Sequence, residues 1–193
     1  MPVTEPTWEI VELFPQQGEW SEEEYMLLPG NRLIEFSDGR IELVPMPSRR
    51  HQLIVRLLTN LLTAFVEQRQ LGLVLFAPFV LRLWPRKNRE PDVMFMLSQN
   101  SHRCFETYWE GADLVMEVVS PDDPDRDLVT KKEEYAKAKI PEYWLVNPIT
   151  ETITIYILDG ETYREAGVFS KGQEAASLLL EGFTVEVTKV FEL

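Results

Sequence analysis

The sequence predicts a mixed α/β (α+β) fold, in which helices flank a mixed β-sheet. Segments with helical periodicity alternate along the chain with segments of strand character, as in layered α/β domains. A near-continuous apolar run over 112–119 is typical of a strand buried on both faces. The 193 residues, 45% of them apolar and 26% charged, have the length and composition of one globular domain.

Two short elements are predicted near the start of the chain. Ser21, followed by three glutamates, is typical of the capped start of a short helix, which we expect to end at 29–30. The turn sequence Ser-Asp-Gly at 37–39 joins two alternating segments and predicts a β-hairpin over 32–44.

A long helix and two strands are predicted next. Ser48 predicts the N-cap of an amphipathic helix over about 51–69. The segment 72–83 predicts one strand that bends at Pro78. A basic loop separates it from an apolar strand over 93–97.

The second half of the chain predicts further strands with one helix between them. The strands are expected at 112–119, 142–146, 152–157, 163–168 and 183–187, and the helix from about Pro124 or Asp127 to Ala138.

The composition excludes several classes of protein and site. The lone cysteine, Cys104, excludes a disulfide framework and a cysteine-rich zinc site. The two histidines, His51 and His102, are too few for a site built from several histidines. No apolar run is long enough to span a membrane, and residues 1–5 lack the features of a signal peptide. We therefore expect a cytoplasmic protein without a membrane segment.

The net charge of −13 opposes binding to the phosphate backbone of nucleic acids. The charge is unevenly distributed, because residues 46–100 hold three acidic and eight basic side chains, a local balance of +5. These bases form either a basic lip on an acidic body or a set of solvated surface charges. They are Arg49, Arg50, Arg56, Arg69, Arg82, Arg86, Lys87 and Arg89.

Glu117 is the most unusual residue in the sequence, because every neighbour in 114–119 is apolar. Strand alternation places its side chain on the same face as Val115 and Val119. A carboxylate buried alone costs several kcal/mol, so a compensating interaction is required. The candidates are a cation on a nearby helix, a divalent metal and a raised pKa.

Asp92 is a second candidate, since it follows a proline and a basic loop at the start of an apolar strand. The ordinary explanation is a polar residue at a strand end. The connection between the strands of Asp92 and Glu117 is long enough to make them antiparallel neighbours, which would bring both carboxylates to one end of the sheet. Such a pair suits a hard, oxygen-preferring cation such as Mg²⁺ or Mn²⁺.

Lys131 and Lys132 lie on the helix that follows the strand of Glu117. Both fit a helical stripe with Leu128 and Tyr135, so spacing alone does not decide which lysine faces inward. An inward lysine could position a water, stabilise a developing phosphorane charge or neutralise the buried glutamate. The ordinary alternative is a surface salt bridge with a neighbouring glutamate.

His51 and Glu35 are further candidates. His51 follows two arginines in the first turn of the long helix. Its candidate roles there are a metal ligand, a base or a phosphate contact, and the ordinary alternative is a cap or surface residue. Glu35 lies on the hairpin on the face of Leu33, either half-buried or at a strand edge. We interpret the tryptophans and tyrosines as packing residues.

The order of these residues resembles the PD-(D/E)XK restriction-endonuclease-like superfamily, through Pro91-Asp92 and 117–119. More closely, the chain resembles the Uma-type family of predicted bacterial endonucleases, from about Trp20 to its end. The segments that carry this closer resemblance are 34–39, His51, 113–121, 126–128, Lys131, 135–136 and 140–146.

The resemblance implies one restriction-endonuclease-like domain over 1–193, with 1–19 as an N-terminal extension. It implies a Mg²⁺- or Mn²⁺-dependent nuclease that hydrolyses phosphodiester bonds in nucleic acid, DNA in preference to RNA. It also implies a homodimer, since enzymes of this superfamily that cut both strands often dimerise.

The same resemblance implies roles for the candidate residues. It implies that Asp92 and Glu117 bind the cation. Val119 stands where the superfamily has a strand lysine, and the similar family places that lysine on the next helix, at Lys131. Glu35 and His51 match further recurring polar positions.

Two alternatives stay open. One is a catalytically silent binding or scaffold protein with the same fold, in which Lys131 only neutralises Glu117. The other is a subunit of a larger assembly, which supplies the affinity for DNA that this acidic chain lacks. Divalent-metal binding separates the nuclease from the silent module, and salt-dependent DNA binding separates it from the assembly subunit.

Overall fold

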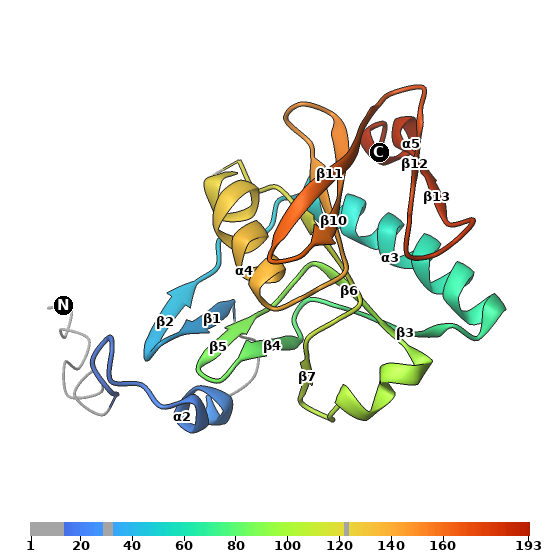
Figure 1. Cartoon of the computed structure of the whole chain (residues 1–193). Helices are drawn as coiled ribbons and strands as arrows, with labels where there is room; N and C mark the ends of the chain where they lie inside the picture. Colours follow the sequence, from blue (N-terminus) through green and yellow to red (C-terminus); the bar gives the residue numbers. More distant parts are fainter. Residues whose placement is uncertain (1–13, 29–32, 122–123) are drawn as a thin grey trace, which may run out of the picture.

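The computed structural model describes residues 14–28, 33–121 and 124–193, and it has mixed β-sheets flanked by helices (Figure 1). The predicted helix end at 29–30, residue 32 of the predicted hairpin and residues 1–13 of the predicted extension lie outside the described residues. The predicted fold class is confirmed. The helical elements are α2 (Glu22–Leu27), α3 (Arg49–Arg69), η1 (Ser98–Arg103), η2 (Arg126–Lys131), α4 (Lys132–Lys137) and α5 (Val187–Phe191).

The larger sheet has six strands in the order β11-β10-β9-β8-β6-β3. β8 pairs antiparallel with β6 and parallel with β9, which makes the sheet mixed. The predicted antiparallel pairing of the strands next to Asp92 and Glu117 is therefore confirmed. The strands are β3 (Gly72–Phe76), β6 (Val93–Leu97), β8 (Leu114–Val118), β9 (Glu142–Asn147), β10 (Thr152–Asp159) and β11 (Thr162–Ser170).

A smaller sheet has five strands in the order β2-β1-β5-β4-β7. The predicted hairpin is its β1–β2 pair, and the last two strands of the chain form a separate two-stranded sheet. These strands are β1 (Ile34–Ser37), β2 (Arg40–Leu43), β4 (Val80–Trp84), β5 (Lys87–Arg89), β7 (Tyr108–Glu110), β12 (Glu174–Ala176) and β13 (Thr184–Glu186).

Two predictions for residues 72–89 are wrong. The segment 72–83 is not one bent strand, because it divides into β3 and β4, which belong to different sheets. Pro78 lies between them, where a residue without an N–H cannot continue the ladder. The predicted basic loop contains β5, which is buried between β1 and β4.

The larger sheet is covered on both faces, with α3 and α4 on opposite sides (Figure 1). Apolar side chains of α3, among them Leu58, pack with Phe95 of β6 and Met116 of β8. Alternate residues of the same strands, with Val115 among them, pack instead with Tyr135 of α4. Glu117 follows the alternation of Val115, so its side chain points toward the helices that come after β8.

The start of α3 agrees with the sequence to within two residues. The hydroxyl of Ser48 accepts a hydrogen bond from the His51 backbone N–H at 3.2 Å, so Ser48 is the predicted N-cap. The helix begins at Arg49, which places His51 in the first turn. No helix in the described part of the chain has the length and apolar character needed to cross a membrane.

Candidate functional site

A cavity of about 260 Å³ lies where the two sheets, the start of α3 and η2 meet. Polar side chains form part of the cavity wall, and the rest comes from Leu33, the segment between β2 and α3 and the turn between β3 and β4. The polar wall includes His51, Glu90, Asp92, Glu117, Ser120, Arg126, Asp127 and Lys131, and the apolar side includes Leu33, Val44, Pro45, Met46, Pro47, Ala77 and Pro78.

Glu117 is buried, as its apolar neighbours predict, and it has two compensating partners. Lys131 Nζ lies 3.0 Å from Glu117 Oε1, and the hydroxyl of Tyr135 donates a hydrogen bond to the same oxygen. Burial raises the pKa of Glu117 to about 8, although the charge of Lys131 acts to lower it. Of the three predicted kinds of compensation, the structure has both the helix cation and the raised pKa.

Lys131, and not Lys132, is the lysine that faces inward. Its Nζ lies 3.1 Å from Asp127 Oδ1 and 3.8 Å from Glu35 Oε1, whereas Lys132 stacks over the ring of Tyr156. Burial acts to lower the pKa of Lys131, but the surrounding carboxylates raise it above its usual range, so the side chain stays charged. η2 is a π-helical turn, and it presents Asp127 and Lys131 on the same buried side.

The alternative that Lys131 forms a surface salt bridge with a neighbouring glutamate, such as Glu134, is wrong. Glu134 instead lies 2.6 Å from Lys87 Nζ and forms a bidentate pair with Arg89, at 2.7 and 2.9 Å. The helix turns these two side chains in different directions, so each meets a different part of the chain.

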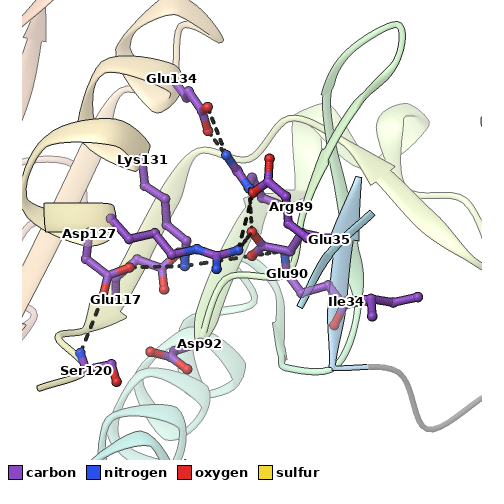
Figure 2. A network of polar contacts seen from close by, with 12 residues as sticks. Ile34, Glu35, Arg89, Glu90, Asp92, Glu117, Ser120, Asp127, Lys131 and Glu134 are labelled. Atoms are coloured by element: carbon purple, nitrogen blue, oxygen red, sulfur yellow. Dashed lines mark hydrogen bonds and ion pairs between the residues drawn. The ribbon is translucent and has the colours of Figure 1, made fainter. Parts of the chain in front are cut away.

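Asp92 reaches the same end of the larger sheet as Glu117 (Figure 2). Its Oδ2 accepts a hydrogen bond from the backbone N–H of Val118 at 2.8 Å and lies 3.1 Å from His51 Nε2. Burial acts to lower the pKa of His51, but Asp92 outweighs this effect and raises it. His51 thus orients the Asp92 carboxylate at the cavity wall.

Glu35 is fully buried, and neither of its predicted positions, half-buried or at a strand edge, is correct. Its carboxylate accepts hydrogen bonds from Arg89 Nη1 at 2.6 Å, from Arg126 and from the Glu90 backbone N–H at 3.2 Å (Figure 2). Burial alone would raise its pKa, but Lys131, Arg89 and Arg126 together lower it to about 2. Glu35 therefore remains ionised and holds three cations in place.

The basic stretch is divided between the interior and the surface. Lys87 and Arg89 are buried in ion pairs with glutamates, so neither a basic lip nor a solvated charge describes them. Arg89 Nη1 also lies 2.5 Å from Glu42 Oε2, which completes a cluster of alternating charges. Burying such charges is tolerated only when they are paired and hydrogen-bonded.

Four of the five predicted site residues line the cavity, and they come from three different elements and the segment before β6. These four are His51, Asp92, Glu117 and Lys131. Glu35 does not line it but lies behind Lys131, 3.8 Å from its Nζ. The structure therefore brings together the residues that the sequence had placed far apart.

Three further polar residues of the site were not predicted, namely Arg126, Asp127 and Tyr135. Asp127 and Tyr135 lie four residues before and after Lys131, and this spacing was the available signal that they share its face. Tyr135, interpreted as a packing residue, also donates to Glu117. Arg126 lines the cavity and binds Glu35, and nothing in the local sequence pattern indicates that pairing.

The donor set fits a hard divalent cation. Within the described ranges, no group of three or more His, Cys, Asp or Glu side chains is arranged to hold a metal ion. Mg²⁺ commonly takes only one or two protein carboxylates, with water and phosphate oxygens as its other ligands. The two carboxylates of Asp92 and Glu117 at one cavity wall meet that requirement, whereas a zinc site would need more protein ligands.

Comparison with known proteins shows the family and the fold of the chain. A family model described as "Uma2: Putative restriction endonuclease" matches residues 20–188. Among solved structures, the chain is similar to a "putative nuclease belonging to DUF820" from Anabaena variabilis, with a TM-score of 0.74. The sequence identity is 16%, over 90% of this chain and 98% of that chain, which supports the shared fold. No curated protein matches the chain.

The low pKa of Glu35 predicts a pH-dependent contribution to stability. A carboxyl whose pKa is 4.5 when unfolded and about 2 when folded stabilises the protein above pH 4.5, and this contribution is lost as the pH falls toward 2. We expect Glu35→Gln to lower the free energy of unfolding at pH 7 by on the order of 3 kcal/mol, and by roughly half of that or less at pH 3.

Urea unfolding followed by circular dichroism at pH 7, 5, 4 and 3 measures this difference. The matched control is Glu161→Gln, which changes a fully solvated carboxylate and should alter stability by less than about 0.5 kcal/mol. An equal loss of stability for Glu35→Gln at every pH would contradict the assignment of its charge.

Proposed function

Because the chain belongs to the Uma2 family of "putative restriction endonucleases", we propose that it hydrolyses phosphodiester bonds of nucleic acid at the cavity beside Asp92 and Glu117. The family and the fold support a nuclease. The cation, the substrate and the roles of individual residues are parts of the proposal.

One observation carries the proposal. Asp92, Glu117 and Lys131 meet at one wall of one cavity, although they come from separate parts of the chain. A buried lysine beside two convergent carboxylates combines a site for a hard cation with a positive charge for a phosphate. A fold that needed only to neutralise Glu117 would not require Asp92 in the same wall.

The residues have distinct roles in the proposed reaction. Asp92 and Glu117 would hold Mg²⁺ or Mn²⁺, which when bound lowers the pKa of a water and offsets phosphate charge. Tyr135 fixes the Glu117 carboxylate through its hydrogen bond, and His51 fixes Asp92. Lys131 orients the attacking water or stabilises the negative charge that develops on the phosphate.

The substrate and the assembly state complete the proposal. We propose DNA as the substrate in preference to RNA, on the basis of the superfamily resemblance. A homodimer is proposed on the same basis, and sedimentation velocity of the purified protein would measure it.

Metal binding is the first test of the proposed site. We expect calorimetric titration with Mn²⁺ to show binding to the wild type and at least about tenfold weaker binding to Asp92→Asn, because that change removes the negative charge of one of the two carboxylate ligands. Glu161→Gln, which removes an exposed carboxylate, should bind Mn²⁺ like the wild type. Absence of binding to the wild type would favour the silent module, in which Lys131 and Glu117 form a structural pair.

Cleavage tests the role of Lys131. We expect Lys131→Met to lower the rate of Mg²⁺-dependent cleavage of plasmid DNA by about 100-fold or more, because it removes the positive charge closest to Glu117. Lys132→Met is the matched control, since the neighbouring lysine contacts the ring of Tyr156 and does not line the cavity. Thermal unfolding checks that both variants are folded, and a wild-type cleavage rate for folded Lys131→Met would contradict the assigned role.

A further inference from the structure

The exposed face of the first half of α3 differs in charge from the rest of the molecule. The chain carries a net charge of −13, yet residues 43–66 contain no aspartate or glutamate and include three arginines. All three are exposed, as is Gln52. Arg50 pairs with Glu151, so within the part of the chain that the structure describes only Arg49 and Arg56 lack a carboxylate partner. This stretch is therefore locally basic on an acidic protein.

The spacing of these residues puts them on one surface beside the cavity. Gln52 lines the cavity, and Arg49 and Arg56 are its helical neighbours at positions i−3 and i+4. The opposite side of the helix carries the buried residues, including Leu58 and Leu62. The two arginines therefore share the exposed face of α3 with Gln52, next to the cavity, while His51 lines it.

The charges of these two arginines are not used elsewhere in the described structure. Arg50 pairs with Glu151 at 2.9 Å, and Lys87, Arg89 and Lys131 are enclosed by carboxylates. By contrast, no carboxylate in the described residues forms an ion pair with Arg49 or Arg56. Their positive charge is therefore available to a partner that arrives from solution.

We propose that Arg49, Gln52 and Arg56 form a track for the phosphate backbone of the nucleic acid strand that enters the cavity. The inference rests on the proposed nuclease function and adds where the strand lies. Seven residues along an α-helix span about 10 Å, which matches about three nucleotide steps of 3.4 Å. The net charge of −13 opposes phosphate binding to the protein as a whole, so Arg49 and Arg56 on this face are where we expect a strand to be attracted.

The test measures binding of a fluorescein-labelled DNA duplex of about 20 base pairs, by anisotropy at several salt concentrations. We expect Arg49→Gln/Arg56→Gln to weaken binding by about tenfold at 100 mM salt. The slope of log K against log salt concentration should fall by about 2, because two phosphate contacts are lost. Arg69→Gln is the matched control, since Arg69 lies on the same helix, roughly 20 Å beyond Arg56.

The outcomes separate this inference from the proposed function. Calorimetry with Mn²⁺ is run on the same proteins, and we expect the double variant to bind the ion as the wild type does. Equal DNA binding by the wild type and the double variant, or an equal loss in Arg69→Gln, would overturn the track but leave the metal site standing. A wild type that binds Mn²⁺ but no DNA would also overturn the track. A wild type that does not bind Mn²⁺ would count against the proposed function.

Discussion

The burial of Lys131 among carboxylates is the interaction on which the site depends. Its Nζ lies close to Glu117 on β8, Asp127 on η2 and Glu35 on β1, so one ammonium group joins both sheets and the helical layer. Each of these charges would be costly if it were buried alone, and Lys131 is the cation that the three carboxylates share. The cavity beside Asp92 therefore borders a network whose charges depend on one another.

A second constraint links that network to the smaller sheet. Arg89 on β5 joins Glu35 on the neighbouring strand to Glu134 on α4, and thereby ties the smaller sheet to the helix that carries Tyr135. Glu35 contacts both Arg89 and Lys131. The ion pairs around Arg89 and those around Lys131 therefore share one carboxylate. This arrangement explains why basic residues of an apparent loop are buried. They hold together elements that would otherwise meet only at their edges.

The sequence indicated the parts of the site that break a local pattern. Glu117 stood out because its strand is otherwise apolar, and Asp92 because it opens the neighbouring strand. The burial of Arg89 could not be predicted, because its carboxylate partners lie 45 to 54 positions away in the chain. The choice between Lys131 and its neighbour likewise could not be made from spacing, because both lysines fit a stripe with Leu128 and Tyr135. It depends on the distant carboxylates of Glu117 and Glu35.

We propose that Asp92 and Glu117 form one metal site beside a charged Lys131. The most direct measurement is the anomalous diffraction of crystals soaked in Mn²⁺, which locates the ion without reference to activity. We expect a peak within about 2.3 Å of a carboxylate oxygen of both residues, with Lys131 still in contact with Glu117. If the cavity residues are ordered but no anomalous peak lies beside them, or if peaks occur only elsewhere on the protein, the proposed metal site is contradicted.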